Sequence, residues 1–206
     1  MAIKSAEYIH RALGAEACDY IERHDFFASD WIKTGMKEDR LIYRHLLNEQ
    51  PHKWLFYRTL ELQQRLGFRR AIPADLEVRI GSQWWCPRRA TLQGVLDFLE
   101  LRPDVRRFFR TTWIPDETVF QTPVPHLVPR AEIRSRTLTF LLFSDYGMPA
   151  NFYNDHYDLL LAQNFLFARK ISLDATELRA RLGALYAAEG VTFTISNEGQ
   201  AGIDQQ

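Results

Sequence analysis

The sequence has 206 residues, of which 46% are hydrophobic, 13% aromatic and 25% charged. This apolar content is enough for a sizeable core, so the composition excludes a disordered or fibrous protein and favours one domain with at most an appendage. The 26 basic side chains balance the 26 acidic ones, which excludes a global field that would attract nucleic acid or an anionic membrane and allows only local basic patches.

The cysteine and hydropathy patterns favour a reducing compartment. Cys18 and Cys86 lie far apart, outside any C-x-x-C or Cys/His cluster, so they predict neither a disulfide framework nor a zinc site. No apolar run reaches the roughly 18 residues of a membrane span, and the N-terminal residues lack the pattern of a signal peptide. We therefore expect a cytoplasmic protein.

Helices and strands are expected to alternate along the first third of the chain. Apolar residues recur at helical spacing after Ser5 and after Pro51, and both positions carry helix-start signals. The expected elements are a helix over Ser5–Ala15, a strand over Cys18–Ile21, a polar loop over Glu22–Asp30, a charged helix over Lys37–Leu47 and an amphipathic helix that ends near Gly67.

The middle of the chain continues this alternation. A strand is expected over Glu77–Trp85, and Gly81 in its centre predicts a bend or a close approach of two backbones. Two helices follow, over Thr91–Leu101 and Asp104–Arg110, and a third begins at Pro115 with Glu117 in its first turn. Pro123, Pro125 and Pro129 predict a loop.

The last third is expected to end in an alanine-rich helix and a tail. Its elements are a buried strand over Leu138–Phe143, a helix from an Asn154-Asp155 cap to Gln163, an apolar run over Phe165–Ile171 and a helix over Ala175–Ala188. The class is therefore α/β or mixed α+β. One domain is expected over residues 1–195, followed by a mobile tail over residues 196–206.

The paired tryptophans form the segment with the most unusual composition. Trp84 and Trp85 follow Gly81, Ser82 and Gln83, and aromatic faces stack on sugar rings while Ser and Gln hydrogen-bond to hydroxyls. One tryptophan turned inward and one outward fits an alternating strand. The alternative is that either tryptophan simply fills the core.

Two other segments carry charges that are suited to catalysis. Glu117 is expected at a helix start, where apolar neighbours raise a carboxyl pKa and the helix dipole lowers it, as a general base near neutral pH requires. Arg169 and Lys170 follow an apolar run, where cations can be held against a diphosphate. An ordinary first-turn acid and a solvated pair of cations are the alternative interpretations.

These motifs belong to an ordered series between Ile3 and Ser172. The most specific are Gly81-Ser82-Gln83-Trp84-Trp85, Pro115-Asp116-Glu117 with Phe120-Gln121-Thr122, and Leu166-Phe167-Ala168-Arg169-Lys170. They are preceded by Ile3–Ile9, Asp30–Gly35, Glu38-Asp39-Arg40 and Gly67–Pro73. In order and spacing the series resembles the core-2/I-branching β-1,6-N-acetylglucosaminyltransferases and their peptide xylosyltransferase relatives, in a bacterial-type version.

The resemblance implies the C-terminal portion of a GT-A-like glycosyltransferase fold, a mixed sheet flanked by helices. It implies an inverting, metal-independent transfer of N-acetylglucosamine, or of a sugar such as xylose, from a UDP-sugar to a glycan or other hydroxyl acceptor, with no cofactor. A non-catalytic glycan-binding remnant is the alternative. The family's N-terminal nucleotide-binding half is expected to lie outside this chain.

The resemblance also assigns roles to individual residues. Glu117 matches the general base, and Lys170, with Arg169 beside it, matches the cation that binds the donor diphosphate. The positions that match acceptor contacts are Gln83, Trp84, Trp85, Lys37 and Arg40. No Asp-x-Asp metal motif is present.

Overall fold

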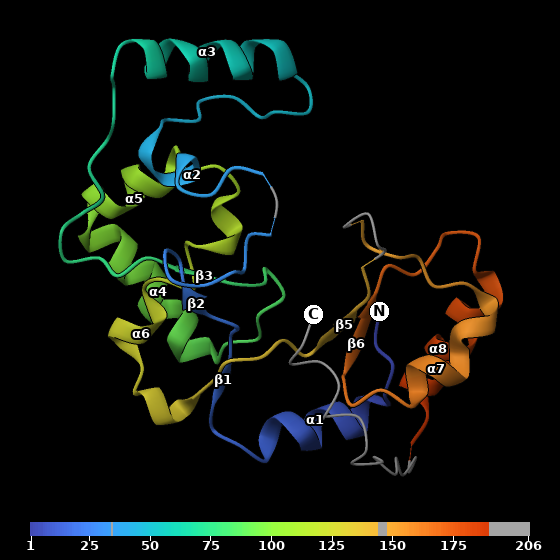
Figure 1. Cartoon of the computed structure of the whole chain (residues 1–206). Coiled ribbons are helices and arrows are strands. Elements are labelled where there is room, and N and C mark those ends of the chain that lie inside the picture. Colours follow the sequence, from blue (N-terminus) through green and yellow to red (C-terminus); the bar gives the residue numbers. More distant parts are fainter. Residues whose placement is uncertain (34, 144–147, 190–206) are drawn as a thin grey trace. The chain divides into compact units, whose positions relative to one another are not determined.

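The computed structural model describes residues 1–33, 35–143 and 148–189, and it divides the chain into two compact units (Figure 1). Unit 1 combines Met1–Ala17 with the segment from Thr137 onward, and unit 2 is the intervening segment Cys18–Arg136. Small sheets flanked by helices make the class mixed α/β. The single domain over residues 1–195 stays a prediction, and the expected tail over residues 196–206 lies outside the described residues.

Unit 1 is built around two parallel strands. β5 (Thr139–Leu141) pairs with β6 (Phe167–Arg169), with Thr139 opposite Phe167. The helices of the unit are α1 (Ala6–Gly14), α7 (Tyr157–Leu161) and α8 (Thr176–Ala187), and the short 3₁₀ helix η3 (Asn154–His156) precedes α7. Figure 1 shows α7 and α8 together beside this pair of strands.

Local signals in the sequence explain where α1 begins and how α8 packs. Ser5 is the N-cap of α1, since its side chain accepts a hydrogen bond from the Tyr8 amide at 3.2 Å, as capping serines do. Leu178 and Leu182, one turn apart on α8, are fully buried. The core of unit 1 is completed by Ile3, Phe140, Phe152, Leu160, Ala168 and Ala175.

Unit 2 contains two further pairs of strands. β1 (Asp19–Tyr20) is parallel to β4 (Ile133–Arg134), and β2 (His24–Asp25) is antiparallel to β3 (Arg79–Ile80). The described strands thus form three separate two-stranded sheets instead of one mixed sheet. The helices of the unit are α2 (Asp39–Ile42), α3 (Lys53–Arg65), α4 (Arg89–Leu101), α5 (Pro103–Arg110) and α6 (Val124–Leu127), with 3₁₀ helices η1 (Pro115–Glu117) and η2 (Arg130–Glu132).

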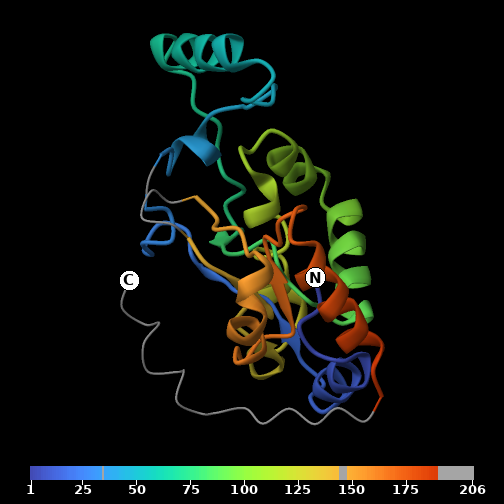
Figure 2. The ribbon, with the colours of Figure 1, turned by 90° about the vertical axis from the view of Figure 1, so that its right-hand side faces the viewer.

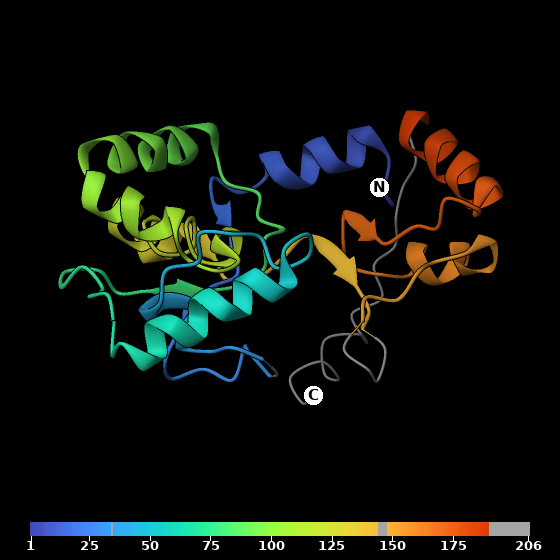
Figure 3. The same ribbon diagram turned by 90° about the horizontal axis from the view of Figure 1, so that it is seen from above.

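The core of unit 2 lies under the antiparallel pair and α5. Figure 3 shows α4 and α5 side by side. Pro103 opens α5 at its first position, where a missing amide costs nothing. The buried residues of this core are Phe26, Leu41, Leu76, Val78, Ile80, Val105, Phe108 and Phe109, and a smaller cluster contains Ile21, Val95, Val124, Val128 and Ile133.

Two predicted helices in unit 2 are wrong in extent. The helix expected over Lys37–Leu47 is reduced to α2, because Arg70 binds the carbonyl groups that would continue it: its side chain donates to the carbonyls of Arg40 (3.3 Å) and Leu41, and its amide donates to that of Ile42 (2.9 Å). The segment that begins at Pro115 forms only the three-residue η1.

Three other expectations differ in detail. α6 begins after Pro123, where a loop was expected, because proline is compatible with the first turn of a helix. The expected loop over Glu22–Asp30 contains β2. Asn154 does not cap the following helix; its side-chain oxygen accepts a hydrogen bond from the Leu178 amide at 3.1 Å. Among the helices that the structure describes, none is long and apolar enough to cross a bilayer.

Candidate functional site

The site in unit 2 centres on an ion pair between Glu117 and Arg40. Glu117 is the last residue of η1, and Arg40 lies in α2. Arg40 Nη1 donates to Glu117 Oε2 at 2.7 Å, while Arg40 Nε donates to the Met36 carbonyl at 2.8 Å. The guanidinium also lies 4.9 Å from the centre of the Trp113 ring. The Arg40 side chain is therefore held in one orientation toward Glu117.

The surroundings of Glu117 shift its pKa in opposite directions. Burial raises the pKa of this carboxyl above its ordinary value, whereas the hydrogen bond and charge of Arg40 oppose the rise. The Glu117 side chain still exposes 24% of its surface. A carboxylate that is partly buried, held by one oxygen and open to solvent can accept a proton from a bound hydroxyl.

The Gly81 backbone lies between the backbones of Glu117 and Glu22. Its amide donates to the Glu117 carbonyl at 3.0 Å. A Cβ atom at this position would lie 1.9 Å from the Glu22 carbonyl oxygen and 2.6 Å from the Glu22 carbonyl carbon. Only glycine fits between the two backbones, which confirms the close approach that was predicted at Gly81.

Gln121 links the segment that carries the tryptophans to η1. Its fully buried side chain donates from Nε2 toward the carbonyls of Ser82 (2.9 Å), Gly81 (3.3 Å) and Asp116 (3.4 Å). The sequence contained Gln121 as part of a motif but gave no signal for this role. Glu117 and the start of the Gly81–Trp85 segment are thereby fixed in one local arrangement.

Trp84 and Trp85 lie in different environments. Trp84 exposes 37% of its surface, whereas the Trp85 ring packs on Phe120 with 4.3 Å between ring centres. The two tryptophans thus differ in exposure, but not by alternation along a strand, because the strand expected over Glu77–Trp85 is reduced to β3, which ends at Ile80. Gln83 is exposed. Because Trp84 is three residues from Gly81, its Cα lies within about 10 Å of the Gly81 Cα.

Lys37 is held by the backbone of a preceding loop. It is half-buried and donates from Nζ to the Ser29 carbonyl at 3.1 Å. Arg40, the other residue expected to face an acceptor, is buried and bound to Glu117. The structure therefore brings Arg40 and Glu117 together, which the sequence did not indicate.

Glu22 and His24 form a second titratable pair next to Gly81, and sequence reasoning missed both residues. Burial raises the pKa of Glu22, while hydrogen bonds from His24 and from the Ser82 backbone oppose the rise. His24 Nε2 lies 3.5 Å from Glu22 Oε1, and the His24 ring stacks on Trp31 with 5.2 Å between ring centres. No motif marks these residues, because the pairing depends on the close approach of Gly81 to Glu22.

Arg169 and Lys170 belong to unit 1. Arg169 is the last residue of β6 and is half-buried, and Lys170 follows it and is exposed. The backbone at Lys170 is fixed on both sides: its amide donates to the Ala150 carbonyl at 3.4 Å, and its carbonyl accepts from the Phe152 amide at 2.7 Å.

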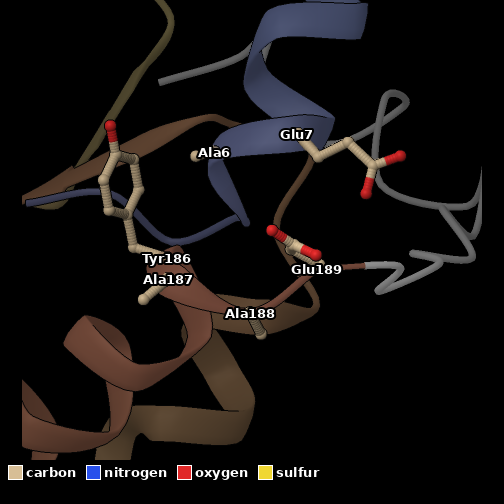
Figure 4. Close-up of a pocket in the computed structure, with 6 residues that line it drawn as sticks. All are labelled: Ala6, Glu7, Tyr186, Ala187, Ala188 and Glu189. Atoms are coloured by element: carbon tan, nitrogen blue, oxygen red, sulfur yellow. The ribbon is translucent and has the colours of Figure 1, made fainter.

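Unit 1 also has a depression of about 510 Å³ that is lined by Ala6, Glu7, Tyr186, Ala187, Ala188 and Glu189 (Figure 4). Its lining comes from the start of α1 and the end of α8. None of the residues predicted from the sequence to be functional lines this depression.

In the described residues of both units, no group of three or more His, Cys, Asp or Glu side chains is placed to hold a metal ion. Metal independence stays a prediction, because it concerns the reaction and not these side chains alone.

Comparison with known proteins finds a family match near the end of the chain. The model of a family of unknown function (DUF5928) matches residues 169–203, a short part of the chain that includes Lys170 and α8. No curated protein matches the chain.

Proposed function

We propose that this chain is the C-terminal portion of an inverting, metal-independent glycosyltransferase with a GT-A-like fold. It transfers N-acetylglucosamine, or another sugar such as xylose, from a UDP-sugar to a hydroxyl of a glycan or other acceptor. The observation that carries the proposal is the Glu117–Arg40 pair, whose Glu117 backbone is bound to Gly81 at the start of the segment that carries Trp84. The ordered motifs of the sequence support the same reaction class.

In this mechanism Glu117 is the general base. Arg40 holds Oε2, so Oε1 takes the proton of the acceptor hydroxyl as the acceptor oxygen attacks the anomeric carbon. The bond between that carbon and the diphosphate oxygen breaks, and its electron pair leaves with UDP. Attack from the face opposite the leaving group inverts the anomeric configuration.

Trp84 supplies an exposed aromatic face for an acceptor sugar, and Gln83 supplies a side-chain amide for its hydroxyls. Trp85 is assigned no contact with substrate, because its ring packs on Phe120. Lys37 is proposed to contact the acceptor through charge or hydrogen bonds. These assignments rest on exposure and on the resemblance.

Lys170 and Arg169 are proposed to bind the donor diphosphate. A leaving diphosphate gains negative charge, and fixed cations stabilise it where no divalent metal does so. This assignment rests on the family resemblance and on the exposure of Lys170.

The test combines a transfer assay with calorimetric titration of UDP and UDP-sugars, on this chain and on a longer chain that includes the expected nucleotide-binding half. Glu117→Gln is expected to lower kcat by roughly 10²–10⁴-fold, the usual contribution of a general base, and to leave the affinity for UDP unchanged. Lys170→Ala is the contrasting variant, because it is expected to weaken UDP binding where Glu117→Gln does not. Activity should persist in EDTA.

Three results would contradict the proposal in different ways. Unchanged turnover in Glu117→Gln would remove this residue from the mechanism and direct attention to Asp116. Loss of activity on chelation would show that a metal stabilises the leaving group. Binding of glycans without binding of any UDP-sugar, both by this chain and by a longer chain that includes the expected nucleotide-binding half, would indicate a non-catalytic glycan-binding remnant.

A further inference from the structure

Exposed apolar side chains cover the outer side of α3 in unit 2. Leu55, Leu62 and Leu66 follow one another at spacings of seven and four residues, which places them on one face of the helix. Their exposed fractions are 43%, 56% and 73%, and Trp54 beside them exposes 70%. We call Trp54, Leu55, Leu62 and Leu66 the outer α3 surface.

The opposite face of α3 fixes the helix to its unit. Phe56 and Leu60 are buried, and the Phe56 ring stacks on His45 with 5.3 Å between ring centres. Gln63 accepts from the Arg44 amide at 2.9 Å and donates to the Arg44 carbonyl at 3.0 Å. Figures 1 and 2 show α3 at the border of unit 2, apart from its other helices. The outer α3 surface is therefore held facing away from the core of unit 2.

The outer α3 surface lies in a basic segment of a chain whose total charge is zero. Residues 53–69 contain four exposed basic side chains, those of Lys53, Arg58, Arg65 and Arg69, and one acidic side chain, that of Glu61. Arg58 lies 3.2 Å from Glu61 Oε2, and its guanidinium lies 5.6 Å from the centre of the Trp54 ring. The remaining cations have no acidic neighbour within this segment of the sequence.

We propose that the outer α3 surface binds the surface of an anionic lipid bilayer. Leucine side chains insert between lipid headgroups, tryptophan settles at the headgroup level, and flanking Lys and Arg side chains contact lipid phosphates. The proposal is independent of the glycosyltransferase assignment, because it uses none of the residues of that site.

The charge of this segment favours a bilayer over a second copy of the chain. A symmetric contact through α3 would bring Arg58 and Arg65 of one copy close to the same residues of the other. Like charges placed opposite each other oppose association. An anionic lipid surface instead offers a counter-charge to Arg58 and Arg65, which flank the leucines on the helix.

The experiment is sedimentation of the full chain with lipid vesicles. Vesicles of phosphatidylcholine alone are compared with vesicles that contain about one quarter phosphatidylglycerol. Binding is expected only to the anionic vesicles and should weaken as salt is added. Arg65→Gln is expected to reduce the partition coefficient about fivefold, the effect of one basic residue near an anionic surface.

Replacement of the three leucines tests the apolar contribution. The variant Leu55→Ser/Leu62→Ser/Leu66→Ser should bind anionic vesicles more weakly than the unchanged chain, by a factor of about ten or more. Leu101→Ser is the matched control, since Leu101 is 81% exposed on α4 of the same unit, and it should bind as the unchanged chain does. The replaced leucines are exposed, and the folding of each variant is to be checked by circular dichroism.

Several outcomes would overturn the proposal. The first is that the unchanged chain does not sediment with anionic vesicles. The second is that the triple variant binds as well as Leu101→Ser. The third, measured by analytical ultracentrifugation, is self-association that the triple variant abolishes without any vesicle binding, which would make the outer α3 surface a contact between copies.

Discussion

The protonation state of Glu117 depends on its distance from one cation. Burial of the carboxyl raises its pKa, and the Arg40 guanidinium at 2.7 Å opposes that rise. A base must be ionised to accept a proton, so Arg40 extends the range of pH over which Glu117 can act.

Removal of this cation is expected to shift the pH dependence of the proposed reaction. In Arg40→Gln the pKa of Glu117 rises further, because burial is no longer opposed by the guanidinium charge. Since the ionised carboxylate is the active form, the acid limb of the profile of kcat/KM against pH moves to higher pH.

The same shift can be measured without any activity. A ¹³C NMR titration of the Glu117 carboxyl carbon reports its pKa directly in both proteins. Arg106→Gln, which removes an exposed arginine of α5, should leave the titration unchanged. An unaltered Glu117 titration in Arg40→Gln would show that the ion pair does not control this group.

Glu22 is expected to make stability depend on pH. Burial raises its pKa in the folded chain, so the folded state binds the proton more strongly than the unfolded state. This stabilising contribution is fully present below the unfolded pKa and is lost as pH rises through the folded pKa. Glu22→Gln should therefore flatten the decrease in the free energy of unfolding over that window.

The measurement is urea unfolding at a series of pH values on both sides of the ordinary carboxyl pKa. Glu61→Gln is the control, because Glu61 lies on the surface of α3 and its ion pair with Arg58 is exposed and contributes little. If both variants follow the unchanged chain at every pH, Glu22 does not titrate differently on folding.

At the scale of elements, the backbones of Gly81 and Glu22 approach each other so closely that no side chain fits at position 81. Gly81→Ala would place a Cβ 1.9 Å from a backbone oxygen, so one of the two segments must move. We expect a loss of about 1–3 kcal/mol in the free energy of unfolding, the usual cost of overpacking. The displacement should also alter the environment of Glu117, whose carbonyl accepts from the Gly81 amide.

Gly183→Ala is the matched control for this substitution. Gly183 lies inside α8, and a Cβ there would meet no atom within 4 Å. Alanine at a helical position stabilises by up to about 1 kcal/mol relative to glycine, so Gly183→Ala should raise the free energy of unfolding measured in urea. Equal effects of the two alanines would contradict the steric argument at Gly81.

Elements with strong local signals could be predicted from the sequence. The helices with a regular apolar face or a side-chain cap, α1, α3 and α4, lie within a few residues of their expected bounds, as does the alanine-rich α8. β1, β3 and β5 also lie inside the segments where strands were expected. In each case the pattern that defines the element is contained in the segment itself.

Features that depend on distant residues could not be predicted. The early end of α2 follows from the Arg70 guanidinium, which is 30 residues away from Arg40 in the sequence. The pairing of Arg40 with Glu117 joins residues 77 positions apart. A single sequence contains no local trace of either contact, so which residues touch could not be predicted.

At the scale of the whole molecule, each unit has its own buried core. Leu160 is fully buried in the core of unit 1, and Leu41 is fully buried in that of unit 2. Replacement of a buried leucine by alanine costs about 2–5 kcal/mol. We therefore expect Leu160→Ala to reduce the hydrogen-exchange protection of unit 1, and Leu41→Ala that of unit 2.

Mass spectrometry of peptic fragments after hydrogen exchange distinguishes the two cases. Fragments from residues 1–17 and 148–189 should lose protection in Leu160→Ala, whereas fragments from residues 18–136 should keep it. A uniform loss over all fragments in both variants would show that the chain unfolds as one cooperative body.

The order in which the chain is synthesised has a consequence for unit 1. Unit 1 combines the first 17 residues with a segment that begins at Thr137, and Ile3, near the start, packs in the same core as Leu182. During synthesis unit 2 is complete when Arg136 has emerged, whereas Ile3 and α1 have no core to join until α8 follows. Residues 1–17 thus leave the ribosome before unit 2 but fold after it, and the apolar face of α1 stays exposed to other nascent chains and to chaperones while residues 18–182 are synthesised.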